Sequence, residues 1–460
     1  MTMNGMTRRD FIRKAGLAAA ALALPTDLLA DAARADRPNF VFILADDLGW
    51  ADLNCYGNTF HETPNIDRLA AEGVRFTNAY AACPVCSPTR ASIMTGRYPA
   101  RIGLTDWIPG HRIKDAKLVT PDVLKYLPHD EITIAEALKS AGYATGSVGK
   151  WHMGGDGYLP QDQGFDINIG GSNAGSPPGG YYLPNKMNLK DMKPGEYLTD
   201  RLASEGAKFI EANKSRPFFL YQAFHSVHIP IQAKKEYQEK YRAKPSGDRK
   251  YNAAYAGMVQ SLDEGVGRIL RTLKDLDLDK RTVVFFVSDN GGFLQYTRND
   301  PLREGKGYLY EGGIRDPMIV RYPPLVKAGR VRETPVSSVD FFPTILEMAG
   351  ARTPKRQIDG ISIVSLLRGK DALPRRALYW HYPHYNSQGG TPASAIRYGD
   401  YKLLHFYEDN HVELYNLRDD ISEQHDLSAK APQTVAKLRG LLSDWLNDVG
   451  AKLPTPIGPR

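Results

Sequence analysis

Two pairs of oxygen-bearing side chains, far apart in the chain, could bind a metal ion. Asp46 and Asp47 follow one apolar run, and Asp289 and Asn290 follow another. Carboxylate and amide oxygens are hard ligands, which favour Ca²⁺ or Mg²⁺ over Zn²⁺. Either pair by itself could instead cap a helix or form an Asx turn at the end of a strand. If both pairs reach the same edge of a sheet, a metal site is the better interpretation.

Basic and imidazole side chains follow two further apolar runs. Residues 146–149 lead to Lys150 and His152, and residues 217–221 approach His228. Side chains two residues apart on an extended segment point to the same side. Lys150 could therefore neutralise an anion beside His152, which could move a proton. A lysine that reaches solvent and a buried structural histidine are the simpler alternative.

The apolar runs themselves predict strands that are buried on both faces. Helical periodicity lies between them, at residues 133–141, 197–212 and 258–275. Strands that alternate with helices predict an α/β fold with a mostly parallel sheet sandwiched by helices. Ligands of such sheets bind beyond the carboxyl ends of the strands. We therefore expect the polar clusters to form one site at that edge, bordered by a long glycine-rich loop at 170–180.

The pattern of polar and apolar residues changes after about residue 370. Residues 395–398 and 401–406 alternate around a Gly-Asp turn and predict antiparallel strands, and a helix is expected at 433–449. We therefore predict a catalytic α/β domain at 36–370 and a smaller α+β subdomain with an antiparallel sheet at 371–460. The aromatic segment 379–385 could line a sugar pocket or pack at the junction between the two.

The first residues predict an export signal. A basic segment with paired arginines (Arg8 and Arg9) precedes an apolar run at 15–24 and a small-residue cleavage site at 33–35. Residues 1–35 therefore read as a twin-arginine signal peptide, which implies the twin-arginine export machinery and a periplasmic or secreted bacterial protein. The apolar run is shorter than the about 20 residues that span a bilayer, so a stable membrane anchor is not expected.

Composition narrows the function classes. The formal net charge of +7 is a mild excess that suits an anionic substrate. Nucleic acid is not an expected partner, because the chain has no basic run interleaved with aromatic residues. Three cysteines form neither a disulfide framework nor a zinc motif. Cys55 and Cys83 could pair with each other or stay buried.

The third cysteine, Cys86, lies in a C-x-P-x-R pattern that ends at Arg90. Alone, the pattern could describe a small buried side chain in a turn before a helix. The whole of residues 84–96 resembles the first signature of the formylglycine-dependent (type I) sulfatases, within the alkaline phosphatase-like superfamily. The resemblance implies that a formylglycine-generating maturation enzyme oxidises Cys86 to an aldehyde. One hydroxyl of its hydrate attacks sulfur and the other later expels sulfate, a second step that a thiolate cannot perform.

Three further segments resemble parts of the same family. Residues 142–152 match the second signature, residues 223–230 match a histidine segment in which Val227 replaces the usual proline, and residues 305–317 end in E-G-G-x-R-x-P. The resemblance implies metal ligation by Asp46, Asp47, Asp289, Asn290 and the modified Cys86. It also implies catalytic roles for Cys86, Arg90, Lys150, His152, His228 and Lys306. Lys306 could also be a plain surface lysine in a glycine-rich loop, and His225 is expected to be structural.

In these roles, Arg90 orients the hydrate, Lys150 and Lys306 neutralise the sulfate, His152 removes a proton and His228 protonates the leaving alcohol. The resemblance thus implies an exported sulfatase that uses Ca²⁺, with Mg²⁺ as the alternative. The expected substrate is a sulfated carbohydrate of galactose or N-acetylgalactosamine type, or an aryl sulfate. The alternatives are a phosphonate monoester or phosphodiester hydrolase of the superfamily and an unmodified protein that binds sulfated glycans. A two-zinc phosphatase is disfavoured, because no extra His/Asp cluster for a second metal is apparent.

Overall fold

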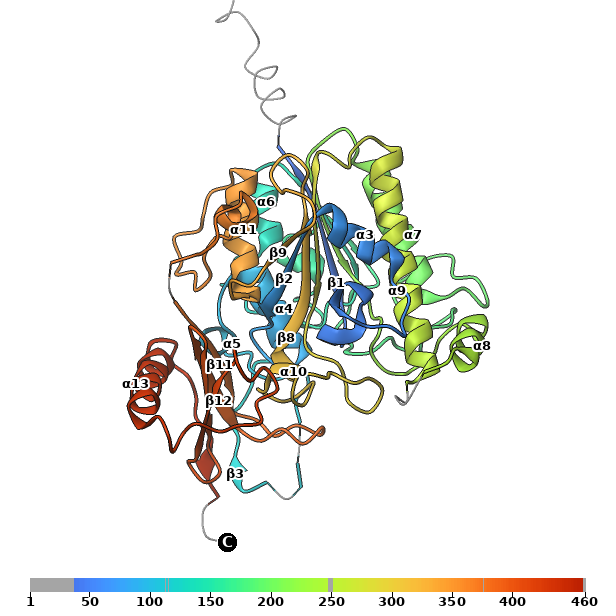
Figure 1. Cartoon of the computed structure of the whole chain (residues 1–460). Coiled ribbons are helices and arrows are strands. Elements are labelled where there is room, and N and C mark those ends of the chain that lie inside the picture. The colour runs from blue at the N-terminus through green and yellow to red at the C-terminus, as the bar shows by residue number, and fades with distance from the viewer. Residues whose placement is uncertain (1–36, 112, 115, 247–250, 375, 458–460) are drawn as a thin grey trace, which may run out of the picture.

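The computed structural model describes residues 37–457 except positions 112, 115, 247–250 and 375. The predicted signal peptide at 1–35 lies outside these residues. The described chain contains one large sheet between helices and one smaller antiparallel sheet beside it (Figure 1). The predicted α/β fold with a smaller antiparallel α+β part is confirmed.

The large sheet has nine strands in the order β10-β2-β8-β7-β1-β6-β4-β5, with β9 paired to β2. The strands are β1 Asn39–Ala45, β2 Val74–Tyr80, β4 Ala144–Gly149, β5 Ile167–Ile169, β6 Phe218–Ala223, β7 Thr282–Ser288, β8 Arg315–Arg321, β9 Arg330–Arg332 and β10 Val336–Ser337. Within the described chain, β8 runs antiparallel to β7 and β2, and the other pairings of this sheet are parallel. The sheet is therefore mostly parallel, as the sequence predicts.

The apolar runs of the sequence form strands, such as β1 and β7, at the centre of the large sheet. β1 and β7 pair in register from Asn39 opposite Thr282 to Ala45 opposite Ser288. Every residue of both strands is buried. A strand covered by helices on both faces has no solvent side, so its sequence is continuously apolar rather than alternating.

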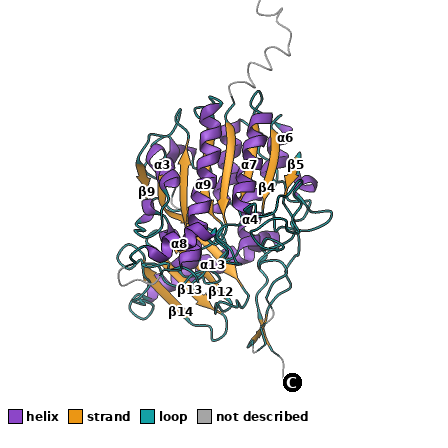
Figure 2. Ribbon diagram, turned by 90° about the vertical axis from the view of Figure 1, so that its right-hand side faces the viewer, coloured by secondary structure: helices purple, strands orange, loops and turns teal. Residues whose placement is uncertain are grey.

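Helices cover both faces of the large sheet (Figures 1 and 2). One face carries α4 Cys86–Thr95, α6 Ile134–Ser140 and α11 Phe341–Ala349; the other carries α3 Pro64–Glu72, α7 Leu198–Ala212 and α9 Ala253–Asp275. Four further helices are α5 Pro99–Ile102, α8 Lys235–Ala243, α10 Glu311–Ile314 and α12 Val364–Leu367. Helix α9 begins five residues before its predicted start because the Asn252 side chain accepts hydrogen bonds from the amides of Ala254 and Tyr255. No helix in the described ranges is both long and apolar enough to cross a membrane.

The smaller sheet has four antiparallel strands, and one helix packs on it. The strands are β11 Ala377–Tyr382, β12 Ala393–Tyr398, β13 Tyr401–Phe406 and β14 Val412–Asn416. Helix α13, Pro432–Asp448, places Leu438 and Leu442 in the same apolar cluster as Ile396 and Leu403 of the sheet. Two short strands, β3 Leu118–Val119 and β15 Thr455–Pro456, pair outside both sheets.

Candidate active site

The predicted site residues meet at one edge of the large sheet. Strands β1, β4, β6 and β7 are mutually parallel, so their carboxyl ends share that edge. Asp46 follows β1, Lys150 follows β4 and Asp289 follows β7, while Cys86 is the first residue of α4. Topology therefore brings together residues that lie more than 240 positions apart in the chain.

Four fully buried side chains, Asp46, Arg90, Lys150 and Asp289, form the deepest part of the site. Lys150 Nζ lies 2.6 Å from Asp46 Oδ2. Arg90 donates to Asp289 Oδ2 through Nε at 2.9 Å, and its Nη2 lies 2.7 Å from the same oxygen. Arg90 Nη1 also donates to the backbone carbonyl of Lys150 at 3.0 Å. Arg90 thus links the loop after β7 to the loop after β4 and holds the Asp289 carboxylate in one orientation.

Asp47 is the centre of a second set of contacts. Lys306 Nζ lies 2.8 Å from Asp47 Oδ2, and His228 Nε2 lies 3.6 Å from the same oxygen. Asn290 Nδ2 donates to Asp47 Oδ1 at 2.8 Å. Lys306 is therefore not a free surface lysine, because its side chain is 10% exposed and its charge is directed into the site.

Cys86 and His152 form the pair that suits nucleophilic chemistry. Cys86 Sγ lies 3.2 Å from His152 Nδ1. His152 Nε2 lies 2.7 Å from the carbonyl oxygen of Ile108, which can only accept a hydrogen bond. The proton of a neutral His152 is therefore on Nε2, and the lone pair of Nδ1 faces Cys86. Burial lowers the pKa of His152 well below its ordinary value, which keeps the ring neutral.

The electrostatics of the acidic pair are asymmetric. Burial raises the pKa of the Asp46 carboxyl to about 8, although Lys150 lies beside it. Burial also acts on Asp47, but the charges of Lys306 and His228 outweigh it and lower the pKa of Asp47 below its ordinary value. Burial raises the pKa of the Cys86 thiol. Asp46 is therefore a carboxyl group whose charged form its surroundings do not stabilise, and a bound cation would favour that form.

The donor atoms fit a hard divalent cation. Asp46 Oδ1 and Asn290 Oδ1 are buried and have no hydrogen-bond partner among the described residues. Oxygens of Asp46 and Asp47 and a ring nitrogen of His228 lie within 4.8 Å of one another. Buried polar atoms are normally paired, so orphaned oxygens in an acidic cluster are consistent with an ion between them.

Backbone geometry explains why the motifs contain these residue types. Asp47 and His152 have positive φ angles of 61° and 59°, a conformation that non-glycine residues rarely adopt and that occurs often at functional sites. Gly149 has φ 103°, and a Cβ there would lie 1.8 Å from the carbonyl oxygen of Ala223. Only glycine lets the Lys150 loop pack this closely on the end of β6.

The site opens into a cavity of about 300 Å³. Its floor contains Cys86, His152, His228 and Lys306. Its walls come from loops: Val85, Trp107, His111, Gly175, Ser176, Ile229, Phe293, Ser387 and Gln388. The predicted loop at 170–180 does border the site through Gly175 and Ser176. Sequence reasoning missed the other wall residues because no motif or periodicity marks a side chain that a loop brings to a cavity.

The aromatic segment 379–385 packs at the junction between the two sheets. Trp380 is 1% exposed and donates from Nε1 to the carbonyl oxygen of Ala81 at 2.7 Å. Tyr379 stacks on Trp445 of α13 with ring centroids 4.7 Å apart. The sequence allowed this segment either to line a sugar pocket or to pack at the junction, and the structure shows that it packs at the junction.

The junction contains a second buried charge cluster that the sequence did not predict. Lys402 Nζ lies 2.9 Å from a carboxylate oxygen of Glu311 and 2.9 Å from one of Glu423, and all three side chains are fully buried. Glu423 also accepts from the Glu311 amide at 2.7 Å. Burial raises the pKa of Glu423 to about 7. Burial is outweighed at Glu311 by the charges of Lys402 and Arg315, which lower its pKa to about 2.

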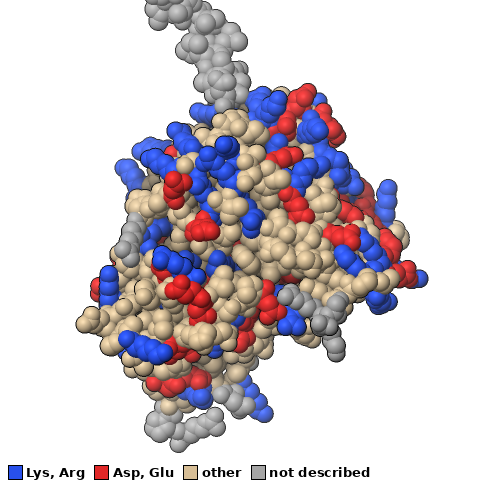
Figure 3. Space-filling view, in the orientation of Figure 1, with Lys and Arg blue, Asp and Glu red and all other residues tan. Residues whose placement is uncertain are grey.

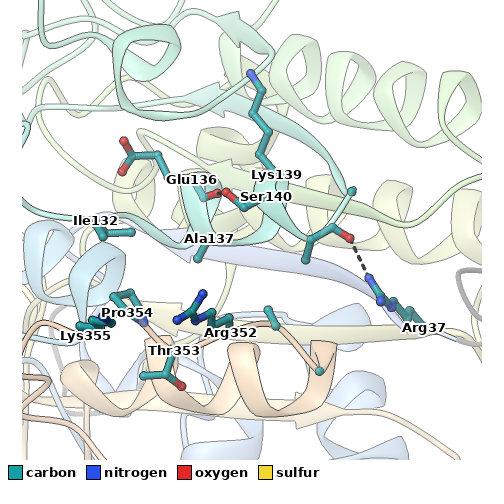
Figure 4. Close-up of a pocket in the computed structure, with 14 residues that line it drawn as sticks. Arg37, Ile132, Glu136, Ala137, Lys139, Ser140, Arg352, Thr353, Pro354 and Lys355 are labelled. Carbon is teal, nitrogen blue, oxygen red and sulfur yellow. Dashed lines mark hydrogen bonds between the residues drawn. The ribbon is translucent and has the colours of Figure 1, made fainter.

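A second hollow lies away from the candidate site. A groove of about 970 Å³ runs between Arg37, α6 and the segment after α11, at the amino edge of the sheet (Figure 4). None of the predicted site residues lines it. Its residues Arg352 and Lys355 have no ion-pair partner within the described residues. Over the face in Figure 3, basic and acidic side chains are interspersed rather than gathered into one patch.

The cysteines are all free in the structure. Cys83 is buried and Cys55 is half-buried. The disulfide between them that the sequence allowed is therefore absent, and neither residue lines the cavity.

The chain is similar to known proteins over most of its length. The family described as Sulfatase matches residues 38–351, and the one described as N-sulphoglucosamine sulphohydrolase, C-terminal, matches residues 305–450. A sulfatase of Formosa agariphila is 33% identical over 89% of this chain and 89% of its own length. The N-acetylgalactosamine-6-sulfatase of dog is 35% identical over 80% of this chain and 72% of its own. The crystal structure of Ps i-CgsB in complex with k-i-k-neocarrahexaose has a TM-score of 0.76 at 34% identity, covering 89% of this chain and 92% of that one.

Proposed function

The chain belongs to the sulfatase family, and we propose that it hydrolyses the sulfate ester of a sulfated saccharide or an aryl sulfate through a formylglycine made from Cys86. The observation that carries this proposal is the position of Cys86. Its Sγ lies 3.2 Å from the free lone pair of His152 and beside a buried cluster of carboxylates and cations. A structural cysteine would not need such neighbours.

A divalent metal ion, Ca²⁺ or alternatively Mg²⁺, is part of this proposal. Asp46, Asp47, Asp289, Asn290 and the modified Cys86 would hold it. The orphaned oxygens of Asp46 and Asn290 support this assignment. When bound, the ion supplies positive charge that polarises the sulfate ester and stabilises an anionic nucleophile.

The residues around Cys86 have distinct proposed roles. The hydrated aldehyde supplies an oxygen that attacks the sulfur, breaks the ester S–O bond and leaves sulfate bound to the enzyme. Arg90 orients the hydrate through its contacts with Asp289 and the Lys150 carbonyl. Lys150 and Lys306 neutralise the charge that spreads over the sulfate oxygens in the transition state.

Two histidines would move the protons. His228 donates a proton to the departing alcohol oxygen, and His152 Nδ1 takes the proton of the remaining hydroxyl so that the C=O bond reforms and sulfate leaves. Burial and the charge of Lys306 lower the pKa of His228 to about 3 without substrate. The negative charge of a bound sulfate ester raises that pKa, since an adjacent anion favours the protonated ring.

We propose an O-sulfated galactose or N-acetylgalactosamine unit as the natural substrate. Support comes from two similar proteins, an N-acetylgalactosamine-6-sulfatase and a protein solved with a neocarrahexaose. The cavity volume of about 300 Å³ is at the lower end of the about 300–1,000 Å³ of small-molecule sites, which fits one sugar ring. Aryl sulfates would react because their leaving group is good.

We further propose that maturation precedes export. The twin-arginine pathway carries folded proteins, and Cys86 is 2% exposed in the folded chain. The formylglycine-generating enzyme would therefore act in the cytoplasm, before the protein reaches the periplasm or the medium. This proposal rests on the sequence of residues 1–35 and on the burial of Cys86.

The test is to measure released sulfate and phosphate from O-sulfated hexoses, an aryl sulfate and a phosphonate monoester. The wild type, matured with a formylglycine-generating enzyme, is compared with Cys86→Ala. Sulfate release by the wild type and its loss in the variant are expected. Sulfate release that survives in the variant would contradict the formylglycine assignment, and phosphate as the main product would identify a phosphonate hydrolase.

A further inference from the structure

The rim of the cavity is built from two segments that belong to different parts of the fold. Residues 105–111 follow α5, and residues 386–390 follow strand β11 of the smaller sheet. The segments meet where the His111 ring lies 3.3 Å from the hydroxyl oxygen of Ser387. Trp107 and His111 from one segment and Ser387 and Gln388 from the other line the same cavity as Cys86.

The 386–390 turn is fixed against the loop that carries Lys306. The Tyr308 hydroxyl donates to the backbone carbonyl of Gln388 at 2.7 Å. A Cβ added to Gly307 would lie 2.4 Å from the side chain of Asn386, so this position requires the close approach that glycine permits. These contacts therefore fix the position of Gln388 relative to Lys306, which is proposed to bind the sulfate.

The 105–111 segment is fixed by buried polar contacts. The Asp106 carboxylate accepts from the His111 amide at 3.1 Å and from the Tyr382 hydroxyl at 2.9 Å. Trp107 Nε1 lies 2.8 Å from His111 Nδ1. His111 is therefore positioned by a carboxylate and an indole before any ligand arrives, and its side chain is 12% exposed.

The polar atoms of this rim are only partly satisfied. Gln388 Oε1 is buried and lacks a hydrogen-bond partner among the residues that the structure describes. The contact from Gln388 Nε2 to Ser387 is long, at 3.3 Å. An orphaned buried acceptor is costly unless a ligand or water donates to it. The remaining wall near it, Phe293 and Ile229, is apolar.

We propose that His111 and Gln388 are specificity-determining residues that bind the hydroxyl groups of the sulfated sugar ring. The side-chain amide of Gln388 binds one ring hydroxyl, His111 binds a neighbouring one, and Trp107 and Phe293 contact the apolar face of the ring. The inference rests on the proposed function, because it concerns how the enzyme binds the sugar ring of the proposed substrate rather than the sulfate that reacts. An aryl sulfate without hydroxyl groups, such as 4-nitrophenyl sulfate, cannot use these contacts.

The test compares Gln388→Leu and His111→Phe, which keep side-chain size and remove the polar atoms. Each variant is expected to lower kcat/KM on an O-sulfated hexose about 10-fold or more and to change kcat/KM on an aryl sulfate less than about two-fold. Gln424→Leu, at an exposed glutamine that does not line the cavity, is the matched control and should change neither value.

A second readout avoids turnover. Binding of the O-sulfated hexose to Cys86→Ala is measured by calorimetry with and without Gln388→Leu, and a Kd at least 10-fold weaker in the double variant is expected. An equal loss on hexose and aryl substrates, or no loss on either, would overturn the inference. Failure of the proposed function looks different, because the wild type itself would then release no sulfate from any substrate.

Discussion

The chain buries lysines against carboxylates in two regions, and they differ in what surrounds the charges. At the candidate site, Asp46, Asp47 and Asp289 face Lys150, Lys306 and Arg90. At the sheet junction, Lys402 lies between Glu311 and Glu423.

The difference is that the first cluster is open and the second is closed. The site cluster borders a cavity through Lys306. Asp46 Oδ1 and Asn290 Oδ1 at the site, and Glu423 Oε1 at the junction, all lack a hydrogen-bond partner among the described residues, so this property is common to both regions. With three carboxylates against three cations it is close to neutral, so a divalent ion would make it attractive to a sulfate ester. The junction cluster borders none of the cavities described above and joins β13 to α10. Burial of charge therefore does not by itself identify a catalytic site; the difference is that the site cluster borders a cavity.

The largest expected effect is on Lys150. In Lys150→Met the transition-state charge loses a stabilising cation, so kcat on an O-sulfated hexose should fall about 10²- to 10³-fold. With metal bound, Asp46 keeps a compensating charge, so the melting temperature should change little. Steady-state kinetics measures kcat, and thermal unfolding in the presence of Ca²⁺ measures the melting temperature. If Lys150→Met had a much lower melting temperature but a normal kcat, the site cluster would behave like the structural cluster at the sheet junction, and the proposed difference between the two would be wrong.

The converse variant is Lys402→Met, at the junction. Removing Lys402 leaves Glu423 without its ion-pair partner and leaves Glu311 with Arg315 alone, so the free energy of unfolding should fall by about 3–5 kcal/mol. The kcat of the protein that remains folded should stay within a few-fold of the wild type. Denaturant titration and kinetics on the same preparation test this, and a selective loss of kcat would show that the junction acts on the site.

Substitution of His228 tests whether this residue protonates the leaving alcohol. His228→Ala should lower kcat/KM on an O-sulfated hexose about 100-fold, because an alkoxide leaves poorly without a proton donor. The loss on an activated aryl sulfate should be below about 10-fold, since a phenoxide leaves unaided. Kinetics on both substrates give the ratio. Equal losses would argue that His228 acts only through its contact with Asp47.

The smallest effect is expected at the groove on the amino edge. The seven residues of β1 separate the two edges by about 23 Å, at about 3.3 Å per residue, which exceeds the Debye length of about 8 Å at physiological ionic strength. Arg352→Ala combined with Lys355→Ala should therefore change kcat/KM on a small sulfate ester less than about two-fold. A selective loss on a polymeric sulfated glycan would instead assign the groove a role in holding the polymer.

The sequence predicts the centre of the site better than its walls. Asp46, Lys150 and Asp289 follow strongly apolar runs, and strand polarity alone places such residues at one edge of a parallel sheet. Their contacts in the structure agree with that expectation, while their catalytic roles remain predictions. Gln388 and Trp107 carry no comparable signal, because a loop residue reaches a cavity through packing that no local pattern encodes.

The sequence by itself determined the fold class, the edge of the sheet at which the chemistry gathers and the family resemblance of the segments around Cys86 and Lys150. These follow from local patterns: apolar runs, helical periodicity and short motifs. The tertiary structure decided the rest. It paired Lys306 with Asp47, aimed His152 Nδ1 at Cys86, packed the 379–385 segment between the two sheets and enclosed Lys402 between two glutamates. Each depends on the distance between atoms far apart in the chain, which only the packing of both sheets fixes.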